Sequence, residues 1–467
     1  MSAAFAHDKA LAVHETPIPG LLLVDLPVPG DNRGWFKENW QREKLLALGL
    51  PDLGPVQNNI SFNDAAGTTR GIHAEPWDKY VSVATGRIFG AWVDLREGET
   101  FGAVFTAELD PSRAILVPRG VGNSYQTLEP DTAYTYLVND HWSPDAAYTF
   151  LNLADETVAI DWPIPLDSVE ISAKDMAHPR LADVVPMAAR KTLVLGGNGQ
   201  LGRALREVFP DAEFTTRAEL DVTDPAAFSS RRWRDYGTII NAAAYTAVDE
   251  AETPEGRVRA WAVNVSAAAA LARVAVAHDL RIVHISSDYV FDGRAREHDE
   301  HEPFSPLGVY GQTKAAADAV ISTAPFHYIV RTSWVIGDGK NFVRTMQSLA
   351  IRGLSPQVVD DQVGRPTFAT ELARGIAHLL ASDAPFGTYN LSNGGPPASW
   401  ADVARRVFTS VGRESTAVKS VSSKDYLRPE QAERPLRSTL DLEKLTRTGF
   451  EPEDWRTALQ HHLDADR

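Results

Sequence analysis

The chain of 467 residues contains no cysteine. This absence excludes disulfide bridges, thiolate nucleophiles and cysteine-ligated zinc sites. Basic residues are also outnumbered, with 46 Lys and Arg against 62 Asp and Glu, a formal net charge of −16. Because affinity for nucleic acid comes largely from Lys and Arg at the phosphates, this balance argues against a nucleic-acid-binding protein. Local clusters of cations can still hold an anionic small ligand.

Long apolar runs are absent too, since no uninterrupted run approaches the roughly 20 residues of a membrane span. The first residues, MSAAFAHDKALAVHETPIPG, show no basic stretch followed by an apolar core. We therefore expect no secretory signal and no membrane role, and we expect a cytoplasmic location. At about 150 residues per domain, the length predicts two or three domains.

Helical periodicity is nearly absent from the front of the chain, apart from QREKLLALG at 41–49. From 20 to 163, short β-rich segments alternate with Gly, Pro, Asp and Asn, which predicts an antiparallel sandwich or barrel. After Lys191, apolar strands alternate with Ala-rich helical stretches, the pattern of βαβ units in a parallel sheet. We expect a first domain at 1–183, a linker at 184–190 and a second domain at 191–467.

The run VLGGNGQLG at 194–202 fits two glycine patterns, GxGxxG and GxxGxxG. Glycines there permit a tight turn and let the backbone approach a pyrophosphate at a helix N-terminus. Such turns are often purely structural, but here an apolar strand precedes the loop and a helical stretch follows, as dinucleotide binding requires.

Tyr310 and Lys314 stand four residues apart in YGQTK, at the start of a predicted helix. At this spacing the two side chains share one face, so an ammonium can lower the pKa of the phenol and hold a nucleotide ribose. Ser286 and Ser287 close the upstream run RIVHISS, where a hydroxyl can orient a carbonyl beside the phenol. The pair alone often occurs by chance on a solvated helix, but chance explains the whole series poorly.

From 191 to about 463 the chain resembles the dTDP-4-dehydrorhamnose reductase family of extended short-chain dehydrogenases. The resemblance is carried by GGNGQLG, NAAAYTAVDEAE, HISSDYVFDG, VYGQTK, RTSWV, NFVRTM and DQVGRPT, in that order. It implies a doubly wound Rossmann-type sheet with a smaller C-terminal substrate-binding portion. It also implies that Tyr310 protonates the C4 oxygen, that Lys314 lowers the Tyr310 pKa, and that Ser287 replaces a usual Thr.

The same resemblance implies the binding residues of this domain. Those at the cofactor would be Gly196, Gly199, Gln200, Leu201, Gly202, Asp221, Val222, Ala242, Ala243, Tyr310 and Lys314. Those near the sugar nucleotide would be Tyr289, Trp334, Asn341 and Gln362. No acidic residue stands where an adenosine ribose hydroxyl would be held, and TTRAELDVTD offers Arg217 to a 2′-phosphate. This favours NADPH, with NADH as the alternative and a solvated surface role as the other interpretation of Arg217.

In the β-rich domain, the segments around His73 and Arg119 are similar to the two motifs of cupin jelly rolls. Metal-binding cupins supply HxH with a carboxylate and then PxGxxH, because a metal needs three or four converging ligands. Here the first motif is His73-Ala-Glu75 and the second ends in Asn123, so we expect no metal. Arg33, Arg70, Lys79 and Arg119 lie beside these motifs, which favours a bound diphosphate over scattered solvated charges.

From about 17 to 183 the chain resembles the dTDP-4-dehydrorhamnose 3,5-epimerase family, through DNRGWFKE, QNNISF, TRGIH, VPRG and DETVAIDWP. The resemblance implies that His73 is the base, Asp155 its carboxylate partner and Tyr136 the acid on the opposite face. It implies substrate contacts from Arg33, Phe36, Glu38, Gln57, Asn59, Arg70, Lys79 and Arg119.

Two departures from the epimerase pattern leave its activity open. The run 122–125 replaces a usual Ala-His-Gly-Phe, which removes a second histidine, and Ala74-Glu75 replaces an aromatic-Gln pair. Epimerisation at both C3 and C5, at one carbon, or at a reduced rate all remain interpretations.

Together the two resemblances predict a bifunctional, homodimeric enzyme that makes dTDP-L-rhamnose from dTDP-4-dehydro-6-deoxy-D-glucose. The alternatives are a reductase that makes another dTDP-deoxysugar, or a non-catalytic subunit that binds a sugar nucleotide. Retention of Ser287, Tyr310 and Lys314 argues against the non-catalytic alternative.

Overall fold

The computed structural model describes residues 9–144, 146–382, 384–426, 428 and 431–465. The chain forms two compact units, Met1–Ala189 and Arg190–Arg467, each of which is described by itself. This division accords with the change from β-rich to alternating sequence that predicts two domains.

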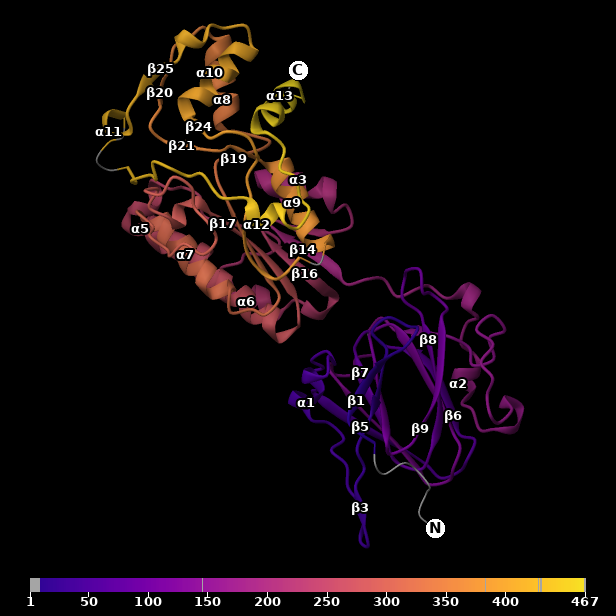
Figure 1. The fold of residues 1–467 in the computed structure, drawn as a ribbon. Coiled ribbons are helices and arrows are strands. Elements are labelled where there is room, and N and C mark those ends of the chain that lie inside the picture. Colours follow the sequence, from indigo (N-terminus) through magenta and orange to yellow (C-terminus); the bar gives the residue numbers. More distant parts are fainter. Residues whose placement is uncertain (1–8, 145, 383, 427, 429–430, 466–467) are drawn as a thin grey trace. The chain divides into compact units, whose positions relative to one another are not determined.

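The first unit is built from two antiparallel sheets that face each other (Figure 1). The six-stranded sheet has the order β1 (Ala12–Glu15), β2 (Leu22–Asp25), β10 (Arg113–Val117), β7 (Lys79–Thr85), β12 (Thr132–Val138) and β5 (Gln57–Asn63). The five-stranded sheet has the order β13 (Thr149–Phe150), β6 (Thr69–Ala74), β11 (Val121–Thr127), β8 (Ile88–Asp94) and β9 (Val104–Leu109). The predicted all-β first domain is confirmed.

Apolar side chains fill the space between the two sheets. Val81, Trp92 and Tyr134 are fully or almost fully buried in one cluster there. Strands β7, β8 and β11 carry nearly continuous buried residues, because both of their faces are covered. Outside the space between the sheets, Tyr80 of β7 packs in a cluster with Leu45 of the helix at 42–47, and Val93 of β8 packs with Leu151 and Met187. This core holds the inward-facing polar side chains of the barrel in place.

Short elements complete the first unit. The predicted helical segment forms α1 (Arg42–Ala47), and a two-stranded hairpin of β3 (Gly30–Asp31) and β4 (Gly34–Trp35) extends away from the body of the unit (Figure 1). After β13 the chain forms η1 (Leu166–Ser168), α2 (Ala173–Met176) and η2 (Leu181–Asp183). Val184 and Met187, which fall in the expected linker, are buried in this unit, and Met187 exchanges backbone hydrogen bonds with Leu95 and Glu97.

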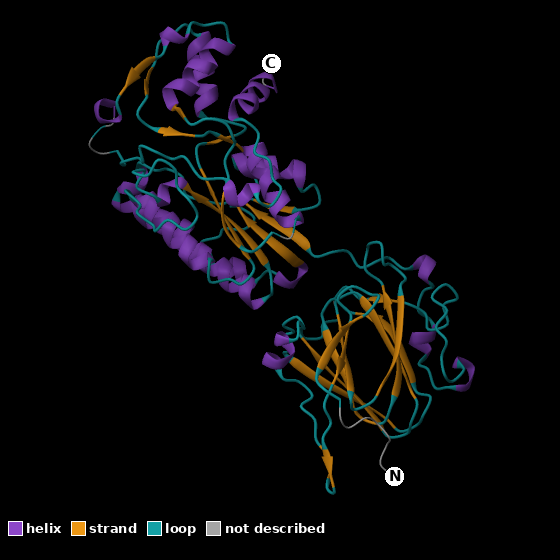
Figure 2. Cartoon of the chain, in the orientation of Figure 1, coloured by secondary structure: helices purple, strands orange, loops and turns teal. Residues whose placement is uncertain are grey.

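The second unit contains a six-stranded, fully parallel sheet with helices on both faces (Figure 2). Its order is β15 (Glu213–Thr215), β14 (Lys191–Leu195), β16 (Tyr236–Asn241), β17 (Arg281–Ser287), β18 (His327–Thr332) and β23 (Gly387–Asn390). The helices of this sheet are α3 (Gln200–Val208), α4 (Pro225–Ser229), α5 (Pro254–Trp261), α6 (Ala267–Ala277), α7 (Val309–Ile321), α9 (Ala369–Ala381) and α12 (Glu443–Thr446), with η3 (Trp233–Asp235), η4 (Glu250–Glu252), η5 (Ala262–Ser266) and η6 (Asp288–Val290). The predicted parallel α/β sheet is confirmed.

A smaller helical portion with its own apolar cluster belongs to the same unit. It contains α8 (Phe342–Ile351), α10 (Trp400–Ser410), α11 (Ser423–Tyr426), α13 (Trp455–Ala465) and η7 (Ser415–Ala417). Two-stranded pairs link it to the rest: β19 (Val335–Ile336) with β22 (Thr367–Phe368), β20 (Gln357–Val359) with β25 (Lys419–Val421), and β21 (Val363–Gly364) with β24 (Ala398–Ser399). It corresponds to the predicted smaller C-terminal portion.

The continuous helical run 254–277 is long and apolar enough, by length and composition alone, to cross a membrane. Charged residues such as Arg259 and Arg273 interrupt it, so it is not a continuous apolar run. Ala268, Leu271 and Ala272 of this run pack into the core beneath the parallel sheet. We therefore interpret it as a core helix of the α/β fold.

Candidate active sites

The glycine loop of the second unit joins β14 to α3. Gly196 has φ of +78°, a conformation that favours glycine, and a Cβ on Gly202 would lie only 2.3 Å from the Gly196 carbonyl oxygen. Gly199 caps α3 without a side chain, so the first amides of the helix are open to a bound phosphate. The local geometry therefore fits a dinucleotide pyrophosphate.

The other predicted cofactor residues surround this turn. The backbone of Ala242 and Ala243 passes within 2.9 Å of a Cβ built on Gly196. Leu201 packs into the core, and the Gln200 side chain accepts a hydrogen bond from the Gly337 amide at 2.6 Å. Gln200 and Leu201 therefore line the loop with backbone rather than with side chains.

The segment after β15 carries the residues expected at the adenosine ribose. Asp221 accepts hydrogen bonds from the backbone and hydroxyl of Thr223, and Val222 packs beside it at the edge of the core. The exposed Arg217 pairs with Asp221 at 3.1 Å. Its guanidinium is thus held at the surface of this segment, where a 2′-phosphate can reach it.

Ser287, Tyr310 and Lys314 meet at the carboxyl end of β17. Tyr310 and Lys314 lie in the first turns of α7, and the Lys314 ammonium donates to the Ile285 carbonyl at 2.5 Å. Burial raises the pKa of Tyr310 to about 12, although a hydrogen bond with Ser287 opposes this shift. Burial and the Asp288 charge thus dominate the Tyr310 pKa, and the expected lowering of this pKa by Lys314 stays a prediction.

Lys314 is itself perturbed. Burial lowers its pKa to about 8, while the nearby Asp318 carboxylate opposes that change. Asp318 also forms a buried ion pair with Arg331, with 3.0 Å between the guanidinium Nε and the carboxylate. This ion pair beneath the site was missed by sequence reasoning, because its members come from α7 and β18.

Asp288, the residue after Ser287, is fully buried next to the site. It accepts a hydrogen bond from the Ser287 hydroxyl at 2.9 Å. Burial raises its pKa to about 6, and its charge contributes to the raised pKa of Tyr310. The motif SSDY contained this residue, but nothing in the sequence indicated its burial.

Asp288→Asn is expected to stabilise the second unit at pH 7.5 but not at pH 4. Folding raises the pKa of Asp288 from 3.8 to about 6. The protonated side chain therefore costs the folded state nothing below pH 3.8, whereas its ionisation destabilises the folded state as the pH rises from 3.8 through 6. The loss amounts to about 3 kcal/mol for this shift, and an uncharged amide avoids it. Calorimetric unfolding at both pH values measures the gain in stability. The unfolding transition of the second unit is identified as the one that added NADPH shifts.

The matched control is Glu443→Gln, which removes an exposed carboxylate of the same unit. Its stability should follow the unaltered chain at both pH values. Equal stability of the Asp288→Asn and unaltered chains at pH 7.5 would contradict the prediction.

The predicted sugar-nucleotide residues separate into two groups. Tyr289 packs edge-on against Tyr310 with ring centroids 5.5 Å apart, and Trp334 stacks on Trp400 at 3.9 Å. Gln362 and Trp400 line a cavity of about 340 Å³ together with Phe342, Tyr426 and Arg434. Tyr289, Trp334 and Gln362 therefore lie at the site or beside its cavity.

Asn341 lies outside this group. Its amide donates to the Gly337 carbonyl at 2.6 Å and accepts from the Arg344 amide at the start of α8. Both ends of its side chain are thus occupied by the backbone. Asn341 therefore holds the loop before α8, and its expected place near the sugar nucleotide stays a prediction.

In the first unit, His73 lies on β6 and faces a cavity of about 440 Å³. Its Nε2 lies 3.0 Å from a carboxylate oxygen of Asp175 in α2. Burial disfavours the charge on Asp175, but the hydrogen bond and charge of His73, the Gly71 amide and His178 together outweigh burial and lower the Asp175 pKa. A carboxylate that accepts the Nε2 proton leaves Nδ1 of His73 free to take up another proton.

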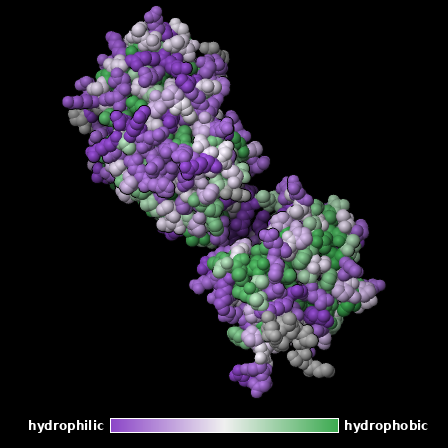
Figure 3. Space-filling model, in the orientation of Figure 1, coloured by the Kyte–Doolittle hydropathy of each residue, from purple (hydrophilic) through white to green (hydrophobic). Residues whose placement is uncertain are grey.

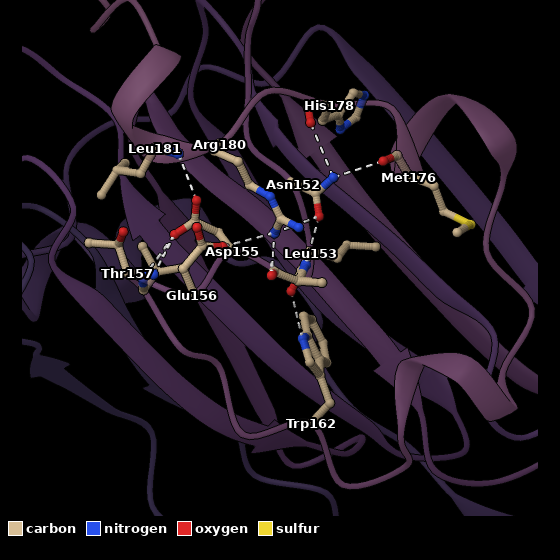
Figure 4. Close-up of polar contacts among 12 residues, drawn as sticks. Asn152, Leu153, Asp155, Glu156, Thr157, Trp162, Met176, His178, Arg180 and Leu181 are labelled. Atoms are coloured by element: carbon tan, nitrogen blue, oxygen red, sulfur yellow. Dashed lines mark hydrogen bonds and ion pairs between the residues drawn. The ribbon is translucent and has the colours of Figure 1, made fainter.

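Asp155 was expected to be the partner of His73, and this expectation is wrong. Its carboxylate accepts backbone hydrogen bonds from Leu181 at 2.7 Å, Thr157 at 2.9 Å and Val158 at 3.1 Å (Figure 4). Burial raises its pKa, but these backbone donors outweigh burial and lower it. Asp155 therefore fixes the loop after β13 and does not contact the imidazole.

Tyr136 lies on β12, in the sheet opposite His73. Burial and the Glu75 charge raise its pKa to about 12, and the Arg70 charge opposes them. The Tyr136 ring packs against the core between the two sheets, with its centroid 5.8 Å from that of Tyr134, so it lies on the inner face of the barrel. Tyr136 is thus a protonated acid within the same interior as His73.

Glu75 does not leave an uncompensated negative charge. It pairs with the buried Lys79 at 2.6 Å and accepts from the Trp77 indole at 2.7 Å. Lys79 in turn lies 5.3 Å from the centre of the Tyr136 ring. Lys79 therefore offsets the negative charge that Glu75 brings to this segment.

Asn123, which stands where a second histidine is usual, is buried inside the barrel. It accepts from the Trp92 indole at 2.9 Å and donates to the Tyr134 hydroxyl at 3.0 Å. These bonds hold the interior together. A different histidine, His178, lies beside His73, with ring centroids 5.3 Å apart.

The structure brings only some of the predicted cations together. Arg70 lines the His73 cavity, and Gln57 and Asn59 bond to each other on β5 at 2.8 Å. The Arg119 guanidinium instead donates to the Ala188 carbonyl at 2.9 Å. Arg33, with 85% of its side chain exposed, pairs with Asp31 on the projecting hairpin, and Phe36 and Glu38 lie in the adjoining segment, where Glu38 pairs with Lys44.

Two family models match the chain. The description "RmlD substrate binding domain" applies to residues 190–467, and "dTDP-4-dehydrorhamnose 3,5-epimerase" to residues 15–183. The protein RmlC homolog of Streptococcus pyogenes is 52% identical over 188 residues, which cover 38% of this chain and 94% of that protein.

The second unit has its own relatives. A dTDP-4-dehydrorhamnose reductase of Aggregatibacter actinomycetemcomitans is 36% identical over 291 residues, or 58% of this chain and 97% of that protein. A crystal structure of dTDP-4-dehydrorhamnose reductase from Bacillus anthracis, in complex with NADP, is 30% identical with a TM-score of 0.55. That similarity covers 59% of this chain and 99% of the Bacillus chain.

Proposed function

Because the chain belongs to the dTDP-4-dehydrorhamnose 3,5-epimerase family in its first unit and to the RmlD substrate binding domain family in its second, we propose that it catalyses two consecutive steps of dTDP-L-rhamnose synthesis. The first unit epimerises dTDP-4-dehydro-6-deoxy-D-glucose at C3 and C5, and the second reduces the C4 ketone. The observation that carries this proposal is the presence of both catalytic sets, His73 with Asp175 and Ser287 with Tyr310 and Lys314, in one polypeptide. The product of the first set is the substrate of the second.

Epimerisation requires removal of a proton beside the C4 ketone and its return from the opposite face. The ketone acidifies the C3 and C5 protons, and His73 takes each proton on Nδ1 while Asp175 stabilises the imidazolium that forms. Tyr136, neutral because burial raises its pKa, supplies a proton from the other sheet. The positive charges of Arg70 and Lys79 compensate the negative charges of the diphosphate and of the enolate that forms. Since neither Asn123 nor Glu75 disrupts this set, we assign epimerisation to both carbons.

The second unit fits NADPH as cofactor. The open start of α3 and the turn of Gly196 and Gly199 suit the pyrophosphate, and Arg217 suits a 2′-phosphate. When bound, NADPH supplies the hydride that reduces the ketone. Tyr310 then donates its phenolic proton to the C4 oxygen, Ser287 hydrogen-bonds that oxygen, and Lys314 stabilises the tyrosinate left behind.

Domain bounds, fold class, oligomeric state and location are assigned from the same premise. We assign the epimerase domain to Met1–Ala189, since Val184 and Met187 are buried in the first unit, and the reductase domain to Arg190–Arg467. We assign the first domain to the cupin jelly-roll class, because its antiparallel strands form two facing sheets. We also assign a homodimer and a cytoplasmic location. A dimer interface on the first unit is supported by the exposed Trp35 and Phe36 of the hairpin region and Ile60 and Phe62 of β5. Apolar side chains also gather on the visible face of this unit (Figure 3).

The full chain, the keto sugar nucleotide and NADPH in heavy water together test the proposal. We expect NADPH oxidation and deuterium at both C3 and C5 of the product, whose C4 configuration is read by NMR. Reduction only of substrate that was epimerised beforehand, without deuterium at C3 or C5, would contradict the epimerase assignment. A product with the other C4 configuration would indicate a reductase for a different deoxysugar.

A further inference from the structure

We propose that His73, Asp175 and His178 form a binding site for one divalent transition-metal ion such as Zn²⁺. One ligand atom of each residue lies within 4.8 Å of the other two. His73 Nε2 is 3.0 Å and His178 Nε2 is 3.8 Å from the same carboxylate oxygen of Asp175. Small side-chain movements therefore bring all three atoms to the distances of about 2.0–2.2 Å that zinc requires.

His178 provides independent evidence for a ligand at this position. Only 6% of its side chain is exposed, yet neither ring nitrogen makes a hydrogen bond of normal geometry within the described residues. The backbone of Leu151 lies close enough to orient one nitrogen, the usual support for a histidine that binds a metal through the other. A buried imidazole without full hydrogen bonding is destabilising, and a bound metal ion removes that penalty.

The surrounding contacts hold the His178 ring in position. It stacks on Phe150 with ring centroids 4.8 Å apart. The Asn152 amide donates to the Met176 and His178 carbonyls, and Figure 4 shows the His178 ring turned away from the Asp155 cluster. Asp175 is fixed in the same way, because the Ser172 side chain caps α2 at its amide. The site is thus preorganised by α2 and the segment after it.

The ligand set selects the class of ion. Two imidazoles and one carboxylate suit Zn²⁺, Co²⁺ or Ni²⁺, whereas Mg²⁺ and Ca²⁺ prefer oxygen ligands alone. Three protein ligands leave a fourth position, and the partly exposed His73 opens to the 440 Å³ cavity from which water can complete the coordination. The expectation of no metal considered only the two cupin motifs, which contain neither Asp175 nor His178.

Occupation of this site would inhibit epimerisation, a consequence that rests on the proposed function. A metal ion on His73 Nε2 and Asp175 replaces the hydrogen bond that makes His73 a base. The Ser287, Tyr310 and Lys314 set of the second unit has no part in this cluster. Zn²⁺ should therefore stop deuterium incorporation and leave reduction of epimerised substrate unchanged.

Metal binding by the full chain tests the site without reference to activity. After treatment with a chelator, we expect one equivalent of Co²⁺ to bind and to give the visible absorption of a site with nitrogen ligands. His178→Phe keeps the stacking on Phe150 but offers no ligand, and it should weaken Co²⁺ binding at least about 100-fold. His14→Phe, which alters an exposed histidine of the same unit, should bind as the unaltered chain does.

The outcomes separate the site from its consequence. Unchanged Co²⁺ binding by His178→Phe, or no stoichiometric binding by the unaltered chain, overturns the site. His178→Gln must also lose binding, and an unfolding temperature of each variant no lower than that of the unaltered chain shows that the loss does not come from misfolding. If Co²⁺ binding depends on His178 but Zn²⁺ does not inhibit epimerisation, the inferred inhibition is overturned and the metal site stands. If the chain does not epimerise its substrate even in the presence of a chelator, the proposed epimerase function alone is overturned.

Discussion

Replacement of Tyr310 with Phe is expected to lower kcat for reduction of the C4 ketone by about 1,000-fold. Loss of a positioned acid removes the proton that the C4 oxygen needs as it becomes an alkoxide, and general acid catalysis of this kind contributes about 100- to 10,000-fold. The buried Tyr310 is a neutral donor at physiological pH, since its pKa is raised to about 12. Single-turnover oxidation of NADPH with epimerised substrate measures the effect.

Two controls accompany this variant. NADPH binding, followed by fluorescence, should change by less than about threefold, because the pyrophosphate is held by the glycine loop rather than by the phenol. Tyr289→Phe, which alters the ring packed edge-on against Tyr310, should lower kcat by no more than about 10-fold. A Tyr310→Phe chain that reduces the ketone within 10-fold of the unaltered rate would assign the acid to another group.

Asp175→Asn is expected to lower deuterium incorporation at C3 and C5 by about 1,000- to 10,000-fold. An amide in place of the carboxylate no longer holds the His73 tautomer with Nδ1 free, and it cannot stabilise the imidazolium. The loss follows the general behaviour of histidine–aspartate pairs, in which the same change costs about 10⁴ in kcat. Reduction of epimerised substrate by the same chain should be unaffected and serves as an internal control.

Asp155→Asn is the matched comparison. Because Asp155 accepts only backbone hydrogen bonds, its replacement should leave the exchange rate within about threefold while the first unit loses about 1–3 kcal/mol of stability. Deuterium exchange and denaturant unfolding distinguish the two effects. A large loss of exchange in Asp155→Asn, with little loss in Asp175→Asn, would restore the partner expected from the sequence.

These two aspartates show where prediction from sequence succeeds and where it ends. Ser287, Tyr310 and Lys314 are linked by local rules, since a strand end and a helix turn bring them together, and the structure does place them at one point. His73 and Asp175 are 102 residues apart, and no periodicity relates a strand of the barrel to a short helix after it. Asp155 was therefore named as the partner by resemblance alone, and Asp175 was not predicted.

The fold itself was more predictable than the site. Alternation of strands and Ala-rich helices predicted the parallel sheet, and closely spaced β segments predicted the antiparallel one. Burial was not predictable. Neither the run SSDY at 286–289 nor the run AHP at 177–179 indicates that Asp288 and His178 are buried. The catalytic and binding roles assigned by resemblance stay predictions until the variants are measured.

The tail of the first unit determines where the chain can be divided. The last strand of the barrel, β13, ends at Phe150, yet Asp175 lies in α2 and Met187 is hydrogen-bonded to Leu95 and Glu97. A fragment that stops at the end of the barrel would keep most of its hydrophobic core and lose the carboxylate that activates its base. An isolated epimerase therefore has to include α2 to keep Asp175, and it has to extend through Ala189 to keep the backbone hydrogen bonds of Met187. A fragment that ends at β13 would contain His73 without its carboxylate partner.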